Sequence, residues 1–352
     1  LSMFITEQVS STFPGMTRSV QSDDRYLTQL KFLFVLCYDR IECRLGRRSV
    51  YDWSAGLFRK CDMSAHKIGV KMGFKNVFDI PLCNLEIDKV TENSDIIVTA
   101  LPHGVSSEIV PQLFNKGKRV LDHSGDFRYE NVDTYEKSYA LKHNAPELIK
   151  HSVYGIPELY REKIKNAKIV GNPGCYPTCT ILGIAPLLSN KLINTKNIII
   201  NGVSGVTGAG RTAKHNFQFS ECDENFKAYK VVNHRHTSEI EQELSLLAGE
   251  EISVSFTPHL APMKRGMMCT TYANLQKECS ANSIIEKYNE FYKDDFFVRI
   301  YDEDALPETK YVAASNFIDI GITVDERLNR VIVTSCLDNL VKGAAGQAIQ
   351  AL

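Results

Sequence analysis

Short runs of apolar and β-branched residues alternate with helical stretches in the middle of the chain. The run at 94–100 predicts a strand, the stretch at 105–116 predicts a helix, and the run at 118–121 predicts another strand. Strand, helix and strand at this spacing indicate a parallel βαβ unit, whose ligands bind at the carboxyl ends of the strands. Ligand contacts are therefore expected from the residues that follow each strand.

A strand-to-helix turn comes next along the chain. The run at 167–170 predicts a strand, GNPG at 171–174 predicts a turn, and the apolar segment from Cys175 to Leu188 predicts a helix. Cys175 is therefore expected to begin a helix directly after a strand.

The remainder of the chain shows mostly two-residue alternation. A strand at 197–201 is expected to lead into a glycine-rich loop at 202–211. Later runs predict strands of a second, largely antiparallel sheet, and the tail predicts a strand and a helix; these segments are 253–257, 267–275, 316–323, 330–335 and 338–350.

The first seventy or so residues have a different character. Four arginines lie between 40 and 48, four cysteines lie before residue 90, and hydrophobic periodicity is weak. This pattern fits a globular α/β domain poorly.

Composition narrows the class of protein and its partners. At 352 residues, with 43% hydrophobic and 24% charged side chains, the chain is long enough for two globular domains. A net charge of −1 argues against a nucleic-acid partner but leaves a small anionic substrate open. The absence of any apolar stretch of about 18 residues argues against a membrane span.

Ten cysteines are scattered without paired CxxC modules, and no secretory signal peptide is recognisable. We therefore expect a reduced, cytoplasmic compartment. A thiol at a helix start has its anion favoured by the helix dipole, which makes Cys175 a candidate nucleophile. The alternative is that Cys175 is a small buried hydrophobe, as Cys179 is expected to be. The pair is a weak metal signal, and we expect no metal.

A cysteine nucleophile needs a partner for proton transfer. The segment HRHTSEI at 234–240 offers His234, His236 and Glu239 at a predicted helix start. The alternative is a solvated helix start with Glu239 in its favourable first turn.

Three further segments carry candidate ligand groups, each with a structural alternative. The loop at 202–211 lacks GxGxxG spacing, so its amides would hold an anion, or it is a flexible loop. His103-Gly104 and the segment 124–128 follow strands, where turn chemistry alone could also explain them. The segment 258–266 is an anion clamp or a rigid connection.

Eight segments occur in a fixed order, and they are TALPHG (99–104), HSGDFR (123–128), YGIPELYR (154–161), GNPGCYPT (171–178), SGVTGAGR (204–211), HRHTSEIEQ (234–242), FTPHLAPMKRGM (256–267) and DNLVKGAAGQAIQ (338–350). Together they resemble the N-acetyl-gamma-glutamyl-phosphate reductase family over roughly the last three quarters of the chain. The resemblance implies an NADP(H)-dependent acyl-phosphate reductase of arginine biosynthesis, EC 1.2.1.38. In that reaction a cysteine thiolate attacks the acyl phosphate to give a thioester and phosphate, and hydride from NADPH then reduces the thioester to N-acetyl-L-glutamate 5-semialdehyde.

The resemblance also implies roles for particular residues. Cys175 would be the nucleophile, and the acid/base histidine would be His236 in preference to His234. The substrate's carboxylate and phosphate would be bound or oriented by Arg128, Arg211, Arg235, Glu239 and Lys264. Cofactor contacts would come from Pro102, His103, Gly104, Ser204, Gly205, Gly208 and Asn339.

For the fold, the resemblance implies a Rossmann-type doubly wound nucleotide-binding domain plus an inserted α/β catalytic and oligomerisation domain. We place the first domain at 1–174 and 316–352 and the second at 175–315. A homo-dimer or homo-tetramer assembled through the inserted sheet is expected. Alternatives are a related semialdehyde dehydrogenase, the lysine-pathway reductase, or a non-catalytic homologue that does not bind cofactor.

The chain departs from the family at its start. The family opens with a strand and a glycine-rich turn that cradles the cofactor phosphates, and no such turn is found before residue 90. We hypothesise that residues 1–75 are a frameshifted or replaced segment. The family also usually continues for some residues beyond position 352.

Overall fold

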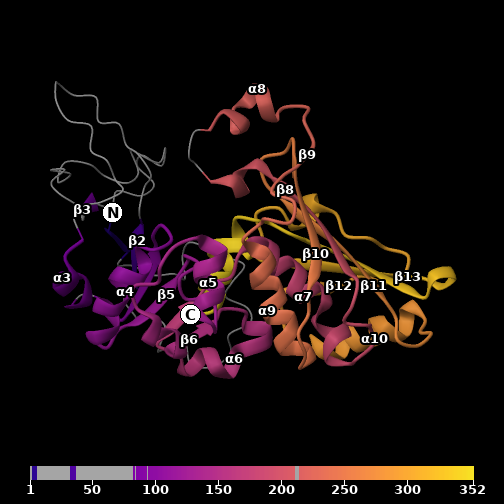
Figure 1. Cartoon of the computed structure of the whole chain (residues 1–352), viewed down its shortest axis with the longest axis horizontal. Helices are drawn as coiled ribbons and strands as arrows, with labels where there is room; N and C mark the ends of the chain where they lie inside the picture. The colour runs from indigo at the N-terminus through magenta and orange to yellow at the C-terminus, as the bar shows by residue number, and fades with distance from the viewer. Residues whose placement is uncertain (1, 6–31, 37–81, 84, 93, 211–213) are drawn as a thin grey trace. The chain divides into compact units, whose positions relative to one another are not determined.

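The computed structural model describes residues 2–5, 32–36, 82–83, 85–92, 94–210 and 214–352 (Figure 1). The chain forms two compact units, Leu1–Asp126 and Phe127–Leu352. Most of the atypical N-terminal segment, and with it the hypothesis about residues 1–75, lies outside the described residues. So does Arg211.

The first unit contains a mixed sheet with the strand order β3-β1-β2-β4-β5. Its described elements are β1 (Ser2–Ile5), β2 (Phe32–Leu36), β3 (Leu82–Cys83), α3 (Ile87–Glu92), β4 (Ile96–Ala100), α4 (Ser106–Asn115) and β5 (Arg119–Asp122). Strands β2, β4 and β5 are parallel, whereas β1 is antiparallel to both of its neighbours. The predicted βαβ unit is therefore confirmed as β4-α4-β5.

The second unit begins with a small parallel pair of strands. This part contains α5 (Val132–Tyr139), the 3₁₀ helix η2 (Pro146–His151), β6 (Ser152–Tyr154), α6 (Pro157–Asn166) and β7 (Ile169–Gly171). Strands β6 and β7 run parallel, and β7 leads through the predicted turn into α7 (Cys175–Ser189). The predicted strand-to-helix turn before Cys175 is confirmed.

The larger sheet of the second unit has the strand order β12-β13-β14-β11-β8-β10-β9. Its strands are β8 (Ile198–Gly205), β9 (Lys227–Ala228), β10 (Val254–Ala261), β11 (Met267–Asn274), β12 (Val298–Ile300), β13 (Ile318–Asp325) and β14 (Arg330–Leu337). Most neighbours are antiparallel, as predicted, but the pairs β8–β10 and β12–β13 are parallel.

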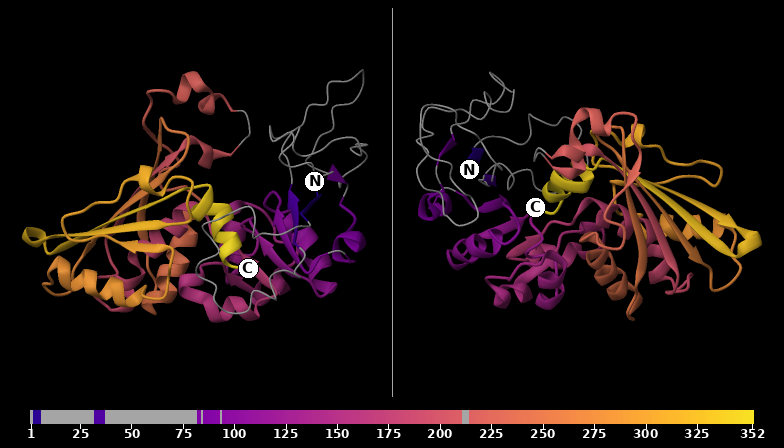
Figure 2. Two further views of the ribbon diagram at one scale, coloured as in Figure 1. Left: turned by 180° about the vertical axis from the view of Figure 1, so that it is seen from behind. Right: turned by 45° about the horizontal axis from the view of Figure 1, so that its top comes forward.

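Three long helices, α7, α9 (His236–Ala248) and α10 (Ala281–Phe291), lie on one face of this sheet (Figure 1), and the views in Figure 2 agree. The shorter elements are the 3₁₀ helices η3 (Val206–Ala209), η4 (His215–Phe217) and η5 (Glu326–Leu328), the helices α8 (Phe219–Cys222), α11 (Thr309–Val312) and α12 (Gly346–Gln350), and the π-helical turn η6 (Val341–Ala345). Helix α7 is buried from Tyr176 to Leu188, because its apolar residues occupy every side of the helix. No helix within the described parts of the chain is both long enough and apolar enough to cross a membrane.

The structure corrects three sequence-based expectations. Strand β8 continues to Gly205, so the first half of the predicted glycine-rich loop is strand. Strand β10 continues to Ala261, so His259 lies within a strand and not in a connection. The predicted tail helix at 338–350 is divided into η6 and α12. In the first two cases pairing with neighbouring strands outweighs the local glycine and proline signals.

Candidate active site

Cys175 is the first residue of α7, and Gly174 is the residue that precedes the helix. A Cβ atom built on Gly174 would lie 2.5 Å from Nε2 of His236, so the absence of a side chain lets the imidazole approach the turn. Pro177 lies in the first helical turn, where its missing N–H costs no intrahelical hydrogen bond. This sequence therefore places the His236 imidazole beside the residue that precedes Cys175.

Burial raises the pKa of the half-buried Cys175 thiol to about 11, although the backbone N–H of Tyr176 and the charge of Arg128 act in the opposite direction. The helix start was expected to favour a thiolate by itself, but burial outweighs that effect. The thiol is protonated near neutral pH, so a neighbouring base must take its proton before the sulfur can attack.

The two histidines of the HRH segment have different surroundings. Nδ1 of His234 accepts a hydrogen bond of 3.1 Å from the backbone N–H of His236, and the His234 ring contacts Tyr176, Tyr229 and Phe256 edge-on. Burial lowers the pKa of His234 to about 3, so this ring stays neutral. His236, at the start of α9, lies against Gly174. The two rings also contact each other, with their centres 4.8 Å apart, but in the glycine-containing turn 171–174 it is His236 that lies against the residue before Cys175.

Glu239, fully buried on α9, connects the turn before Cys175 to the neighbouring segments. Its Oε1 accepts hydrogen bonds from the backbone N–H of Gly174 at 2.8 Å and from the hydroxyl of Tyr154 at 2.7 Å. Its Oε2 pairs with Nη1 of Arg128 at 3.2 Å. The solvated helix start considered from the sequence is therefore wrong for Glu239. The carboxylate holds the turn before Cys175, and removal of either charge would leave the other buried without this pairing.

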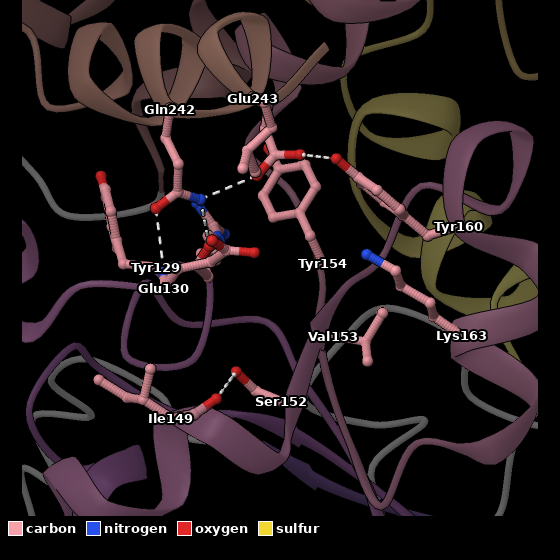
Figure 3. A pocket seen from close by; sticks show the side chains of 12 residues that line it. Tyr129, Glu130, Ile149, Ser152, Val153, Tyr154, Tyr160, Lys163, Gln242 and Glu243 are labelled. Atoms are coloured by element: carbon pink, nitrogen blue, oxygen red, sulfur yellow. Dashed lines mark hydrogen bonds between the residues drawn. The ribbon is translucent and has the colours of Figure 1, made fainter. Parts of the chain in front are cut away.

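A cavity of about 80 Å³ lies beyond this ion pair (Figure 3). Glu243, also on α9, accepts hydrogen bonds there from the hydroxyl of Tyr160 and from the amide of Gln242. Burial raises the pKa of the Glu243 carboxyl to about 7. Cys175 and His236 are not among the residues that line this cavity, so the cavity does not include either side chain.

In the first unit, two buried carboxylates organise the carboxyl ends of β4 and β5. Asp122 accepts hydrogen bonds from Thr99, Ser106 and Ser124, and burial raises the pKa of its carboxyl to about 6. Asp126 accepts hydrogen bonds from the backbone N–H groups of Gly104 and Ser107. The sequence analysis did not single out these aspartates as organising groups.

The loop after β4 holds the three cofactor contacts predicted in this unit. Pro102 is exposed, His103 is half-buried and accepts a hydrogen bond from the N–H of Gly125, and Gly104 has a φ of 86°. An open loop at the carboxyl edge of parallel strands fits a bound nicotinamide nucleotide. Because Asp126 already binds the amides at the start of α4, a phosphate is not expected there.

The glycine-rich segment of the second unit is held by backbone pairing. The N–H groups of Gly205, Val206 and Thr207 donate to the carbonyls of Gly266, Met263 and Lys264, respectively. These three amides are therefore committed to protein partners, and an anion bound by this segment would need other donors. Ser204 is buried, and a Cβ on Gly208 would lie 2.8 Å from its Oγ.

The remaining predicted site residues lie in varied settings. Asn339 is buried, and its amide accepts from the N–H of Gly266 and donates to Thr207. Arg235 is exposed, with its guanidinium 5.5 Å from the centre of the Tyr139 ring, and Lys264 is exposed.

Comparison with known proteins gives the class first. The NAD-binding domain of semialdehyde dehydrogenases matches residues 61–167, and the semialdehyde dehydrogenase dimerisation domain matches residues 175–339. The solved aspartate semialdehyde dehydrogenase from Francisella tularensis superposes with a TM-score of 0.61 at 15% identity, covering 83% of this chain and 88% of that one. The molecule therefore has the semialdehyde dehydrogenase fold, and the predicted fold class is confirmed.

Sequence relatives then give the particular family. An N-acetyl-gamma-glutamyl-phosphate reductase from Acetivibrio thermocellus is 64% identical over 278 residues, which are 79% of this chain and 80% of the relative. Another, from Caldicellulosiruptor saccharolyticus, is 56% identical over 277 residues with the same coverage. The chain belongs to the N-acetyl-gamma-glutamyl-phosphate reductase family.

Proposed function

We propose that this protein catalyses the NADPH-dependent reduction of N-acetyl-L-glutamyl 5-phosphate to N-acetyl-L-glutamate 5-semialdehyde and phosphate, in arginine biosynthesis. Identity of 64% to an enzyme of that name supports the substrate. The observation that carries the chemistry is the approach of the His236 imidazole to Gly174, next to the Cys175 thiol at the head of α7.

The first half of the reaction uses this pair of side chains. His236 takes the proton of the Cys175 thiol, and the sulfur attacks the carbonyl carbon of the acyl phosphate. The carbon–oxygen bond to phosphate then breaks, so phosphate leaves and a thioester remains on Cys175. Because burial raises the pKa of the Cys175 thiol, the thiolate would form only as His236 removes the proton during attack on the substrate.

The second half returns the sulfur to its starting state. The chemistry that bound NADPH supplies is a hydride, which brings the acyl carbon to the aldehyde level. The carbon–sulfur bond then breaks and the aldehyde carbonyl forms. His236 returns to the sulfur the proton that it took in the first half of the reaction. In the first unit, Pro102, His103 and Gly104 would contribute cofactor contacts. For the second unit the family resemblance implies cofactor contacts at Ser204, Gly205, Gly208 and Asn339.

The charged residues predicted from the sequence would contact the anionic groups of the substrate. Arg128, Arg211, Arg235, Glu239 and Lys264 would bind or orient the carboxylate and the phosphate of the acyl phosphate. Arg128 and Glu239 form a buried ion pair, and Glu239 also binds the backbone N–H of Gly174. These contacts support a role in which the pair orients the turn before Cys175.

The assembly and the location of the enzyme follow the family resemblance. We place the nucleotide-binding domain at 1–174 and 316–352 and the catalytic domain at 175–315, in a cytoplasmic homo-dimer or homo-tetramer. Along β11, Met268, Thr270 and Tyr272 are half-buried on the sheet face opposite the buried alternation. A second copy packed on this face would cover them.

The test is phosphate-dependent reduction of NADP by N-acetylglutamate semialdehyde, with a Cys175→Ala variant beside it. Turnover that disappears in the variant supports the reaction and the nucleophile together. Substitution of NAD for NADP tests cofactor preference, which we expect to favour NADP by at least about tenfold in kcat/KM. A folded protein without turnover, and without micromolar NADPH binding, would contradict the proposal.

A further inference from the structure

The C-terminal segment of the second unit packs directly on the proposed nucleophile. A Cβ atom built on Gly343 would lie 2.8 Å from Cβ of Cys175 and 3.3 Å from its Cα. These atoms are fixed to the backbone of α7, so rotation of a side chain cannot relieve the contact. Any side chain at position 343 would therefore force apart Cys175 and the turn that carries Gly343.

Gly343 lies in the π-helical turn η6, whose hydrogen bonds span five residues. The N–H of Gly343 donates to the carbonyl of Asp338 at 3.0 Å, and the N–H of Ala345 donates to that of Leu340 at 3.2 Å. Such turns are rare and are often found at functional sites. Asp338, fully buried, also accepts hydrogen bonds from the N–H groups of Leu340 and Val341, which fixes the start of the turn.

Buried polar contacts on both sides hold the turn in place. Lys342 and Glu158 form an ion pair whose side chains are both fully buried, and Gln350 hydrogen-bonds to both of them. On the other side, the amide of Asn172, three residues before Cys175, donates to the carbonyl of Ala344 at 3.0 Å. The turn is thus linked both to the interior and to the strand-to-helix turn that carries Cys175.

We propose that Gly343 is a positioning residue for the nucleophile: the π-helical turn presses its backbone against Cys175 and thereby sets where the thiol lies. This inference rests on the proposed function, since it gives Cys175 the nucleophilic role. In this proposal the buried Lys342–Glu158 ion pair holds η6 in place, so that the backbone of Gly343 stays in contact with Cys175.

The experiment compares Gly343→Ala with Gly183→Ala. Gly343→Ala adds a methyl group against the first residue of α7, whereas Gly183→Ala adds one on α7 itself, where it meets the side chain of Ser335 more than two helical turns from Cys175. Three quantities are measured for each: kcat and KM for the acyl phosphate, the rate of Cys175 alkylation by iodoacetamide followed by peptide mass, and the melting temperature. Alkylation reports the thiol's position without requiring turnover.

For Gly343→Ala we expect kcat to fall by about 100-fold, because misplacement of a reacting atom by an ångström has an effect of that size. KM should stay within about twofold, and alkylation of Cys175 should slow by at least about tenfold. Gly183→Ala should leave kcat and alkylation unchanged even if it lowers the melting temperature. Equal kcat and equal alkylation in the two variants would overturn the proposal.

A second variant covers the case in which Gly343→Ala does not fold. Gln350→Ala removes hydrogen bonds that anchor the turn but does not contact Cys175, and it should lower kcat and change the alkylation rate by about threefold to tenfold. Unchanged values in this variant would count against the proposal. If the wild type alkylates at Cys175 but does not turn over, the proposed function fails, while the response of alkylation to Gly343→Ala still decides the positioning role.

Discussion

Two glycine-containing turns of the second unit differ in how their backbone N–H groups are used. At 171–174, one N–H group binds the buried carboxylate of Glu239, and the missing side chain of Gly174 admits the imidazole of His236. At 205–207, three successive N–H groups donate to carbonyls of the neighbouring segment 263–266. The first turn leaves room for a reactive group, and the second closes on the protein itself.

The difference shows that glycine content alone does not define a ligand loop. What matters is whether the amides and the free space are already used by the fold. In the first turn a carboxylate and an imidazole from another helix complete the arrangement, and in the second the connection between β10 and β11 does so. The predictions below test this contrast, from the largest expected effect to the smallest.

Cys175 and Cys179 lie one helical turn apart on α7, and alanine substitutions at these two positions should differ most strongly in their effect on kcat. Cys175→Ala should abolish turnover, by on the order of 10⁴-fold or more, because the thioester cannot form. Cys179 is fully buried and contacts the carbonyl of Ser335, so Cys179→Ala should retain kcat and lose about 1–2 kcal/mol of unfolding free energy. Steady-state rates and urea unfolding measure both. Comparable activity losses would remove the distinction.

His236 and His234 should also differ. His236→Asn should lower kcat by about 10²- to 10⁴-fold, because the thiol loses its base. His234→Asn should lower kcat by less than about tenfold, since a ring with a strongly lowered pKa exchanges no proton near neutral pH. The pH dependence of kcat is measured for both variants. A larger loss of kcat in His234→Asn than in His236→Asn would identify His234 as the base.

The two glycines give the direct test of the comparison. Gly174→Ala should lower kcat by about 100-fold, because the added methyl group would meet the imidazole of His236 at 2.5 Å. Gly208→Ala should leave kcat within about threefold and raise KM for NADPH by about tenfold, as a cofactor contact would. If Gly208→Ala instead lowered kcat as strongly as Gly174→Ala, the two turns would share one function.

Glu243 lies outside this comparison of turns and offers a test of stability. Its folded pKa of about 7 lies above the ordinary value of 4.5, so its contribution to stability is present at acidic pH and is lost as pH rises through 7. Glu243→Gln should therefore gain up to about 3 kcal/mol relative to wild type between about pH 4 and pH 8. Urea unfolding at the two pH values measures this difference. A difference that does not depend on pH would show that the carboxyl is not strained by burial.

Hydrophobic periodicity was sufficient to predict the elements around the site. The strand at 167–170 and the helix from Cys175 to Leu188 were predicted close to their bounds in β7 and α7. Prediction was weaker where glycine and proline lie within strands, as in β8 and β10. There, pairing with neighbouring strands decides the conformation, and local sequence does not reveal it.

Several residues that organise the site carried a signal in the sequence but no readable role. Tyr154 and Glu158 lie in the segment YGIPELYR, and Gly343 lies in DNLVKGAAGQAIQ, both of which support the family resemblance. Their partners are Glu239, Lys342 and Cys175, which lie far from them along the chain. Such pairings depend on the tertiary fold, so residue type and spacing could not predict them.

The sequence by itself determined the family, the order of the elements and the place of Cys175 at a helix start, because these follow from ordered motifs and local periodicity. Tertiary structure decided the state and surroundings of that thiol. Burial raises its pKa against the helix dipole, Glu239 holds the turn before it, and Gly343 packs against its Cα and Cβ atoms. These effects depend on desolvation and close packing between segments distant in sequence, which no local pattern encodes.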